Sequence, residues 1–391
     1  MPEAASPAVP SETRRRVVLL RGNAANVPEL QAWEHVGGDY DVSVLVPGSN
    51  DRDVSALSFG QVPVQTVGER IPGGRLGGLA TRVVGDRYLG LEERLRGADV
   101  VHAAELSFWF SWQAAKLKQQ LGYKLALTVW ETLPFVEAYR NVRTRRYRRD
   151  VIAATDLYLA TTERARDALV LEGVAPERIE VAPPGISVDR FAAARVAAPP
   201  ADGRHLILST GRLVWEKGHQ DLLRAVALLR SRGRDDLRVM ICGVGPEERR
   251  LRGVAHDLGL DDVVEFRGYI DNDEMPSVYA QASCLVLASI AIRYWEEQFG
   301  LVLAEAMAAH VPVVAAASGA IPEVVGDDGL LFSSGDWVGL ADTLARGPLA
   351  ASPGTRRAPD AARMARYSHA AQGARLRAAY DGLLGRRSAS V

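Results

Sequence analysis

The chain has 391 residues, 47% of them hydrophobic, and its 47 lysines and arginines are balanced by 48 aspartates and glutamates, for a formal charge of −1. This length and apolar content suffice for two domain cores, and the even charge excludes a general electrostatic attraction to nucleic acid or to an anionic membrane. The two cysteines, Cys242 and Cys284, each lie in an apolar stretch typical of a buried strand, so we expect reduced thiols and a cytoplasmic protein.

The first residues, 1–13, are rich in Ala, Pro and Ser and are acidic where a signal peptide is basic. We expect them to form a disordered tail. No apolar run approaches the roughly 18 residues that span a bilayer, so we expect neither export nor membrane insertion.

Short apolar runs then alternate with longer segments of helical periodicity. The first run, at 16–21, ends in the turn residues Gly22 and Asn23. The other predicted strands of this half are 40–46, 98–102, 124–130 and 156–160, and its predicted helices include 106–121 and 163–172. Alternating strands and helices predict a parallel sheet covered by helices, here a Rossmann-like domain over residues 14–191.

An Ala/Pro-rich segment at 192–203 has too few large apolar residues to pack a core, and we interpret it as a linker. A second series of strands follows at 205–210, 237–242, 263–267, 283–288 and 312–316, with helical segments between them. The sequence therefore predicts a second doubly wound α/β domain over residues 204–358.

Two such domains that face each other create a cleft at the carboxyl ends of their strands, where open α/β sheets bind ligands. We therefore expect the functional site in that cleft. Within the final segment, 359–391, residues 360–384 combine Arg and Ala with apolar residues at helical spacing. This pattern predicts one amphipathic helix, which we expect to pack back on the N-terminal domain.

The stretch 295–307, between a predicted strand and an apolar helix, carries the strongest chemical signal. Gly300 allows close approach of a ligand to the backbone, and the first helical turn leaves unpaired N–H groups at its positive end, which suits an anionic diphosphate. Farther along, the Glu305 carboxylate can accept hydrogen bonds from the vicinal hydroxyls of a ribose. The alternative is that Glu297 is an acidic helix start and Glu305 a solvated helix residue. Ligand binding is favoured because Glu305 is embedded among core positions and needs a partner.

A second polar segment follows the strand predicted at 205–210. Arg212 and Lys217 lie in a glycine-containing loop and can reach one anionic group. Together, a guanidinium and an ammonium can neutralise a leaving diphosphate, a task otherwise given to a metal. No His/Cys/Asp cluster has metal-ligand spacing, so we expect no metal site. The alternative is a surface Arg and Lys that flank a helix start.

Five motifs occur in one order along the second half. They are Gly211-Arg212 with Lys217-Gly218; Cys242-Gly-Val-Gly-Pro246; Phe266-Arg-Gly-Tyr-Ile270; Glu297-Gln-Phe-Gly-Leu-Val-Leu-Ala-Glu305; and Ser318-Gly-Ala-Ile-Pro-Glu323. In this order and spacing they resemble family 4 of the retaining glycosyltransferases, over most of the chain. The resemblance implies the GT-B fold, in which two Rossmann-like domains face each other across a cleft. It also implies transfer of a sugar from a nucleotide-diphosphate sugar, of UDP or GDP type, to an acceptor hydroxyl, with no further cofactor and with the acceptor on the N-terminal domain.

The same resemblance assigns roles to individual residues. Arg212 and Lys217 would bind the donor diphosphate, Glu297 would face the transferred sugar, and Glu305 would bind the ribose. Ile270 would contact the base. The remaining implied donor contacts are the backbone of Phe299, Gly300 and Leu301, and Gly22 in the family's glycine-containing loop near the donor phosphate.

Two positions depart from the family pattern. After the strand predicted at 124–130, many members carry a His that touches the donor sugar, whereas this chain has Trp130 and Glu131. Trp130 can stack on a sugar face and Glu131 can bind an acceptor hydroxyl; a buried Trp and a helix N-terminal Glu are the alternatives. Ala320 replaces a frequent glycine.

Two weaker signals concern the acceptor. His102 and Glu105 lie at the end of a predicted strand whose carboxyl edge should face the cleft, which makes them candidate acceptor contacts, although a lone His there is commonly structural. The strongest local charge is the run Arg140, Arg143, Arg145, Arg146, Arg148 and Arg149. These arginines can hold an anionic acceptor such as a lipid phosphate, with peripheral membrane contact, or they form a solvated helix face.

A further glycine pattern, Gly243-Val-Gly245, is not a dinucleotide fingerprint because Glu248 occupies its third glycine position. The sequence thus predicts a retaining, metal-independent transferase that acts on a glycolipid, polysaccharide or small-molecule acceptor and not on nucleic acid. Two alternatives stay open. One is a sugar-nucleotide epimerase of the same fold, although such epimerases lack the paired-glutamate arrangement that Glu297 and Glu305 form in this sequence. The other is a catalytically silent nucleotide-sugar-binding scaffold.

Overall fold

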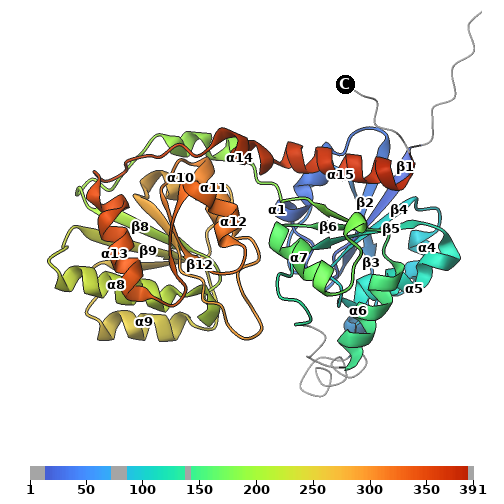
Figure 1. Ribbon diagram of the computed structural model, residues 1–391, viewed down its shortest axis with the longest axis horizontal. Coiled ribbons are helices and arrows are strands. Elements are labelled where there is room, and N and C mark those ends of the chain that lie inside the picture. Colours follow the sequence, from blue (N-terminus) through green and yellow to red (C-terminus); the bar gives the residue numbers. More distant parts are fainter. Residues whose placement is uncertain (1–13, 72–85, 137–141, 386–391) are drawn as a thin grey trace, which may run out of the picture. The chain divides into compact units, whose positions relative to one another are not determined.

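The computed structural model describes residues 14–71, 86–136 and 142–385, so the predicted tail at 1–13 lies outside them. The described residues form two sheets of parallel strands covered by helices, which confirms the predicted α/β class (Figure 1). The chain divides into two compact units: Met1–Leu127 with Arg143–Leu157 and Leu376–Val391, and Thr128–Val142 with Tyr158–Arg375.

One sheet has seven strands in the order β3-β2-β1-β4-β5-β6-β7. Its strands are β1 (Arg15–Leu20), β2 (Tyr40–Pro47), β3 (Gly60–Val64), β4 (Val100–Ala104), β5 (Lys124–Val129), β6 (Leu157–Ala160) and β7 (Ile179–Val181). All five residues of the central strand β4 are buried. This explains why its sequence is apolar at every position except His102, because a parallel strand covered on both faces has no solvent side.

Helices along this half connect the strands. They are α1 (Val27–Leu30), η1 (Gln31–His35), α2 (Val67–Arg70), α4 (Leu91–Leu95), α5 (Trp109–Leu121), α6 (Val142–Ala154), α7 (Glu163–Leu171) and η2 (Pro176–Arg178). Their ends follow local chemistry: α5 stops at Gly122, which adopts a φ of 80°, and the Thr162 side chain caps α7 by accepting a hydrogen bond from Ala165 N.

The other sheet has six strands in the order β10-β9-β8-β11-β12-β13. Its strands are β8 (His205–Thr210), β9 (Leu237–Cys242), β10 (Val264–Gly268), β11 (Cys284–Leu287), β12 (Val313–Ala317) and β13 (Gly329–Ser333). The predicted bounds of β8 and β9 are confirmed to the residue. Cys242 on β9 and Cys284 on β11 are buried free thiols, as expected.

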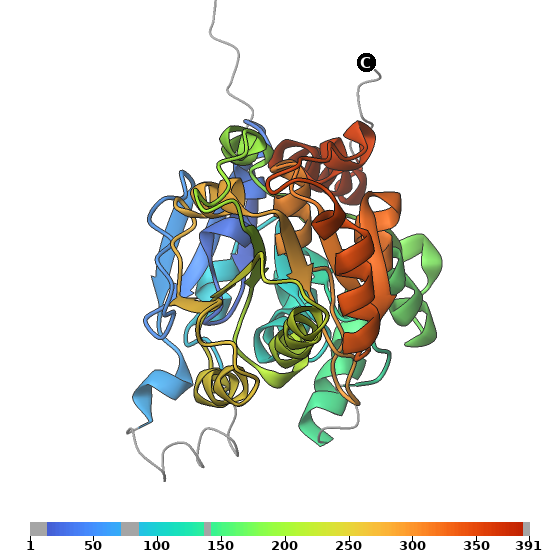
Figure 2. The same ribbon diagram turned by 90° about the vertical axis from the view of Figure 1, so that its left-hand side faces the viewer.

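Two separate cores lie on the faces of the six-stranded sheet, and the helices that contribute to them cover its two sides (Figures 1 and 2). Helices α8 (His219–Ser231), α9 (Glu248–Asp257) and α13 (Trp337–Arg346) pack on one face. Helices α10 (Met275–Gln281), α11 (Leu301–Ala308) and α12 (Ile321–Val325), with η3 (Val188–Arg195), pack on the other. The short helices η4 (Trp215–Lys217), η5 (Gly326–Asp328) and η6 (Pro348–Ala350) lie in the connections.

The prediction of one continuous C-terminal helix at 360–384 is wrong. The segment forms α14 (Ala361–Arg366) and α15 (His369–Leu383), which are separated at Tyr367 and Ser368. Ile186 pairs with the backbone at this break, donating from its N to Tyr367 O at 2.6 Å and accepting from His369 N at 3.2 Å. Ser368 Oγ then caps α15 by accepting from Ala371 N. A main-chain partner far along the sequence therefore interrupts a helix that its own periodicity would continue.

The Ala/Pro-rich segment 192–203 is also more ordered than a bare linker. Its first residues belong to η3, where Ala194 is buried, and Ala198 N donates a hydrogen bond to Ala280 O at 2.8 Å. Small side chains here allow the backbone to lie close to α10.

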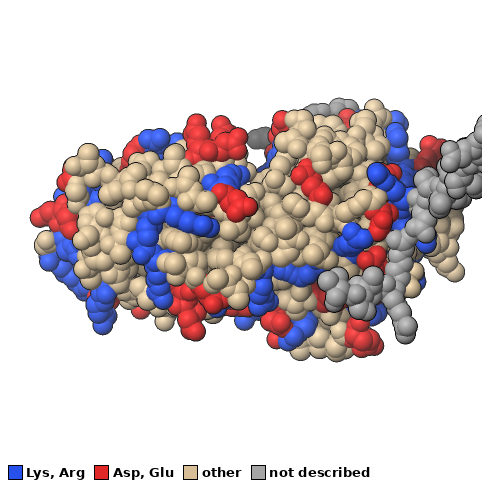
Figure 3. Space-filling view, turned by 90° about the horizontal axis from the view of Figure 1, so that it is seen from above, with Lys and Arg blue, Asp and Glu red and all other residues tan. Residues whose placement is uncertain are grey.

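Lysines and arginines lie scattered among aspartates and glutamates over the face shown in Figure 3. Within the described ranges, no helix combines the length and the apolar character that a membrane crossing requires.

Candidate functional site

Loops at the carboxyl edge of the six-stranded sheet pack backbone against backbone. A Cβ atom on Gly243, after β9, would lie 1.9 Å from Gly211 O, and one on Gly218 would lie 1.8 Å from Ala288 O. Gly211 N also donates to Cys242 O at 3.0 Å. The glycines after β8 and β9 are therefore required for close loop packing, which accounts for Gly243 without a dinucleotide cofactor.

A largely buried ion pair joins two of these loops. Lys217 Nζ donates to Glu297 Oε2 at 2.7 Å, and the two side chains are 15% and 7% exposed. Ser289 Oγ donates to the same oxygen at 2.7 Å, and Lys217 Nζ lies 5.0 Å from the centroid of the Trp295 ring. The pair is thus held on several sides, and the structure brings together two residues that the sequence singled out separately.

The backbone of Glu297 is fixed by the loop after β12. Ala320 N donates to Glu297 O at 2.8 Å, and a Cβ atom on Gly319 would lie 2.0 Å from that oxygen. Gly319 has a φ of 54°, whereas Ala320 has a φ of −86° in the right-handed helical region. The glycine that the geometry needs is therefore Gly319, and an alanine at 320 fits without strain.

Helix α11 begins next to this loop. Gly300 is its N-cap with a φ of 80°, and no side chain caps the helix. A Cβ atom on Gly300 would lie 2.8 Å from Leu303 Cδ1 and 3.0 Å from Leu287 Cδ2. Phe299 is buried, so it is the backbone of Phe299, Gly300 and Leu301 that carries the helix start. Uncapped N–H groups at the positive end of a helix suit an anion.

Glu305 lies within α11 and is partly buried. Tyr279 Oη donates to Glu305 Oε2 at 3.0 Å, which supplies the partner expected for a carboxylate among core residues. Burial raises the pKa of Glu305, while the Tyr279 hydrogen bond and the positive charge of Arg190 act in the opposite direction.

Arg212 differs from Lys217 in its surroundings. Its side chain is exposed, and among the described residues its guanidinium makes no hydrogen bond or ion pair. Its carbonyl oxygen, however, accepts from His219 Nε2 at 3.2 Å, and His219 Nδ1 lies 3.0 Å from Ser209 Oγ. Since a carbonyl only accepts, His219 carries its proton on Nε2, and burial lowers its pKa to about 4. A neutral histidine therefore holds the loop from which Arg212 projects.

The predicted base contact, Ile270, follows β10. It is partly buried and packs against the core that contains Phe299 and Tyr279. Ile270 therefore lies on the sheet face covered by α10 and α11, the face that also carries Glu305.

Sequence reasoning missed the residues that support this site. They are Arg190, His219, Tyr279 and Ser289. Each lies in an apolar or helical stretch where the neighbouring residues give no indication of a polar role. That role becomes visible only through a partner distant in the sequence.

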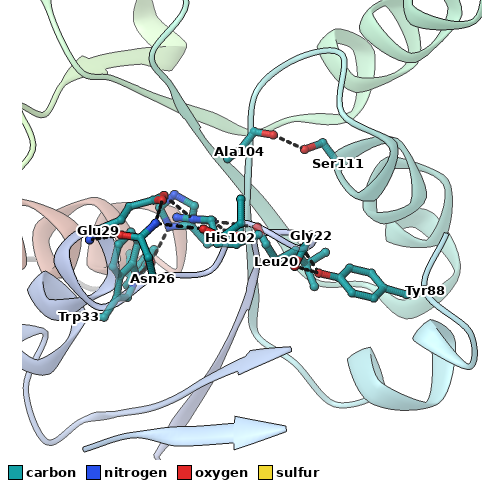
Figure 4. A network of polar contacts seen from close by, with 12 residues as sticks. Leu20, Gly22, Asn26, Glu29, Trp33, Tyr88, His102, Ala104 and Ser111 are labelled. Atoms are coloured by element: carbon teal, nitrogen blue, oxygen red, sulfur yellow. Dashed lines mark hydrogen bonds and ion pairs between the residues drawn. The ribbon is translucent and has the colours of Figure 1, made fainter. Parts of the chain in front are cut away.

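In the first half of the chain, Gly22 lies in the turn after β1 with a φ of 59° (Figure 4). Its N donates to Tyr88 Oη at 2.8 Å, and an added Cβ atom would lie 2.9 Å from the Phe110 ring. Next to it, the buried Arg21 donates from Nε to Glu29 at 2.7 Å. Packing and backbone conformation both require a glycine at position 22. The contact of Gly22 with a donor phosphate stays a prediction.

His102 is fully buried in β4. Trp33 Nε1 donates to Tyr380 Oη at 2.8 Å, and that hydroxyl lies 2.6 Å from His102 Nδ1, within hydrogen-bond distance. Burial, with the nearby Arg21, holds the pKa of His102 well below its ordinary value. His102 lies with Trp33 inside the polar network of Figure 4, where packing accounts for it, and this geometry gives no support to the predicted acceptor contact.

The other candidate acceptor contacts follow β4 and β5. Glu105 adopts a φ of 61°, which is uncommon for a residue with a Cβ atom and concentrates at functional sites. Glu131 Oε1 accepts from Thr132 N and Leu133 N, both at 2.9 Å, so one of its oxygens fixes the local turn. Trp130 is partly buried. Their acceptor roles stay predictions.

The arginine run lies largely on α6, apart from Arg140, which lies outside the described residues. The described arginines are Arg143, Arg145, Arg146, Arg148 and Arg149. Tyr147 stacks on Trp112 with ring centroids 4.7 Å apart, and Asp150 pairs with Arg149 at 3.1 Å. The helix is thus anchored by its one aromatic residue, and its basic side chains belong to a largely exposed face. In the described part of the chain, no group of three or more His, Cys, Asp or Glu side chains is arranged to hold a metal ion.

Two family models match the chain, and together they extend over both halves. The model described as Glycosyltransferase Family 4 matches residues 32–190, and the model described as Glycosyl transferases group 1 matches residues 191–347.

Curated relatives agree with these models. A D-inositol 3-phosphate glycosyltransferase of Corynebacterium kroppenstedtii is 32% identical over 246 residues, 57% of this chain and 53% of the relative. A 2-deoxystreptamine glucosyltransferase of Streptomyces kanamyceticus is 32% identical over 196 residues, 47% of this chain and 49% of the relative. The chain spans about half the length of the curated relatives it matches.

Solved structures show the same fold. Anabaena Alr3699/HepE in complex with UDP has a TM-score of 0.66 at 18% identity and covers 95% of this chain and 97% of its own. Sucrose-phosphate synthase from Thermosynechococcus elongatus has a TM-score of 0.68 at 19% identity and covers 96% of this chain and 100% of its own. Both sheets of the chain therefore belong to the GT-B architecture expected from the sequence.

Proposed function

The chain belongs to the group 1 glycosyltransferases, and from this premise we propose that it transfers a sugar from a nucleoside-diphosphate sugar to an acceptor hydroxyl, with retention of configuration and without a metal ion. The observation that carries the proposal is the buried pair of Lys217 and Glu297, with Nζ and Oε2 2.7 Å apart, beside the uncapped start of α11.

This arrangement supports binding of the donor diphosphate by positive groups alone. Lys217 supplies an ammonium, Arg212 an exposed guanidinium, and α11 the N–H groups of its first turn. Negative charge grows on the diphosphate as the bond to the sugar breaks, and fixed cations stabilise that charge. The site therefore needs no metal to neutralise the leaving group.

In the proposed reaction, the bond between the anomeric carbon and the phosphate oxygen breaks, and its electron pair stays on the diphosphate. The acceptor hydroxyl forms the new bond to the anomeric carbon on the same face, and its proton passes to the departing phosphate. Glu297 faces the transferred sugar. Its position is set by Lys217, Ser289 and the Gly319 loop.

The nucleoside is proposed to bind along α11, with Glu305 on the ribose and Ile270 against the base. UDP is the first nucleotide to test because one structural neighbour was solved with UDP and, separately, with UDP-glucose. The names of the relatives add two small polyhydroxylated acceptors, an inositol phosphate and an aminocyclitol, to the glycolipid, polysaccharide and glycoside classes proposed from the sequence.

The basic face of α6 supports an anionic acceptor. Five arginines in the described part of the run, on a helix whose Val142 is exposed, would attract a phosphate-bearing acceptor or an anionic lipid headgroup. Charge alone favours this partner, so co-sedimentation with vesicles that do or do not contain anionic lipid tests it separately from turnover.

The test of the proposed function is a turnover assay with UDP- and GDP-sugars, each with and without a panel of acceptors, in the presence and absence of chelator. The proposal predicts that nucleoside diphosphate and a glycoside form only when acceptor is present, that NMR shows an unchanged anomeric configuration, and that chelator leaves the rate within about twofold. Donor rearrangement without acceptor would identify an epimerase instead. Binding without turnover would identify a scaffold, and a complete loss of rate with chelator would reject metal independence.

A further inference from the structure

Tyr279 is a fully buried tyrosine whose hydroxyl contacts the proposed ribose ligand. It lies on α10, and its Oη is 3.0 Å from Glu305 Oε2 and 3.3 Å from Val302 O. A phenol has one hydrogen to donate, so the shorter contact to the charged oxygen is the stronger one. The Glu305 carboxylate is therefore held from one side by a neighbouring helix.

This hydroxyl is a permanent donor. Burial raises the pKa of Tyr279 well above its ordinary value, and the negative charge of Glu305 raises it further. Tyr279 consequently keeps its proton at any working pH. With Oε2 occupied by this bond, Oε1 keeps its full capacity to accept hydrogen bonds from a ligand.

Arg190 adds a positive charge to the same cluster. Its guanidinium carbon lies 4.9 Å from the centroid of the Phe191 ring, and that buried ring packs edge-on against Tyr279 with centroids 5.5 Å apart. Among the described residues, Arg190 Nε is buried and has no hydrogen-bond partner. Charged and titratable groups that act on Glu305 come from two packed elements, Tyr279 on α10 and Arg190 on η3.

We propose that Tyr279 and Arg190 are positioning residues for nucleoside recognition: Tyr279 orients the Glu305 carboxylate so that its free oxygen meets the ribose hydroxyls, and Arg190, placed over the Phe191 ring that packs against Tyr279, adds positive charge to the same cluster. The inference rests on the proposed function and deepens it, since it names the residues on which discrimination between ribonucleoside diphosphates and their 2′-deoxy counterparts depends.

The selection has a simple physical origin. A hydroxyl that donates to an oriented, desolvated carboxylate makes a charge-assisted hydrogen bond, and a ligand that lacks this hydroxyl leaves the carboxylate oxygen unpaired. Without Tyr279, the carboxylate rotates more freely and meets the remaining hydroxyl equally well in several orientations. Discrimination between the two ligands, rather than affinity alone, is therefore the property that Tyr279 controls.

The test measures dissociation constants for UDP and 2′-deoxy-UDP in the full chain, with GDP and ADP pairs as alternatives if UDP does not bind. The wild type is expected to prefer the ribo form by at least about tenfold. In Tyr279→Phe the preference should fall to within about threefold. Tyr123→Phe is the matched control, because Tyr123 is a buried tyrosine whose hydroxyl donates to a backbone carbonyl, Ala114 O, far from Glu305 in the chain. Its preference should equal that of the wild type.

Arg190→Met provides a second variant if Tyr279→Phe does not fold. Loss of the positive charge should move the acidic limit of UDP binding to higher pH, because Glu305 then takes up a proton more readily. An unchanged ribo preference in Tyr279→Phe, or an unchanged acidic limit in Arg190→Met, would overturn the inference. A wild type that binds none of the three nucleoside diphosphates would instead overturn the proposed function.

Discussion

Lys217 Nζ donates a 2.7 Å hydrogen bond to Glu297 Oε2 across 80 positions of the chain. Both side chains are largely buried, and the Ser289 hydroxyl donates to the same carboxylate oxygen. The pair connects the loop after β8 to the approach to α11. Each charge thus neutralises the other.

The first prediction concerns the stability of this pair. Lys217→Met leaves Glu297 as a buried carboxylate with the Ser289 hydrogen bond but without its positive partner, so we expect the variant to lower the free energy of unfolding by about 3 kcal/mol. Glu297→Gln removes the other charge, and the double variant removes both. The double variant should lose clearly less than the sum of the two single losses, as measured by denaturant unfolding. Additive losses would show that the pair carries no coupling energy.

A second prediction separates stability from binding at Glu305. Burial raises the pKa of Glu305, so its stabilising contribution is complete below the ordinary pKa of a glutamate and is lost as pH rises through the raised value. Above the ordinary pKa of a glutamate, ionisation of this buried carboxylate therefore opposes folding. Glu305→Gln should raise the melting temperature at pH 7.5 and leave it unchanged at pH 4, while it weakens nucleoside diphosphate binding. A lower melting temperature at pH 7.5, or unaltered binding, would contradict this account.

We expect His219 to contribute to the loss of folding stability at acidic pH. Because burial lowers its pKa to about 4, its contribution to stability is present above the ordinary value of 6.5 and is lost as pH falls through about 4. Within that window the loss amounts to about 1.4 kcal/mol per pH unit for one fully buried histidine. His219→Gln should flatten the decline in unfolding free energy between pH 6.5 and pH 4. Parallel curves for the variant and the wild type would refute the assignment.

Substitution of Gly319 tests whether the close approach of the Gly319 loop to the Glu297 backbone is needed to position Glu297. Gly319→Ala places a Cβ atom 2.0 Å from Glu297 O at a φ of 54°, so we expect both a loss of stability and a loss of turnover. Gly259→Ala is the control, since Gly259 has a φ of 66° and nothing within 4 Å of an added Cβ. The control should cost only the backbone strain, about 1–2 kcal/mol, and keep full turnover. Equal effects in the two variants would mean that the contact with Glu297 is unimportant.

The fold could be predicted from the sequence where strands are central. β8 and β9 are buried, and their apolar runs end at turn residues, so their bounds were predictable to the residue. The sequence did not predict β3, β7 or β13. β3 and β7 are the edge strands of the seven-stranded sheet, and β13 is one edge strand of the six-stranded sheet. These edges are short and partly exposed, so they lack a continuous apolar run.

The site could be predicted where charged residues interrupt an apolar pattern. Arg212, Lys217, Glu297 and Glu305 stand out in this way, and the structure joins Lys217 to Glu297 directly. Tyr279 could not be found, because a tyrosine in an apolar helix is most simply a core residue. Its hydroxyl gains a role only from Glu305, 26 positions away, and no local periodicity encodes such a partner.

Arg212 gives the most direct test of the central claim that cationic side chains stabilise the leaving diphosphate. Because its guanidinium is exposed and makes no hydrogen bond or ion pair within the described chain, Arg212→Met should leave the melting temperature unchanged. At saturating donor its kcat should fall by roughly 10²–10³-fold, as for loss of one preorganised group that stabilises transition-state charge. Arg249→Met, at another exposed arginine on α9, is the matched control and should retain the wild-type kcat. A folded Arg212→Met protein with undiminished kcat would contradict the account.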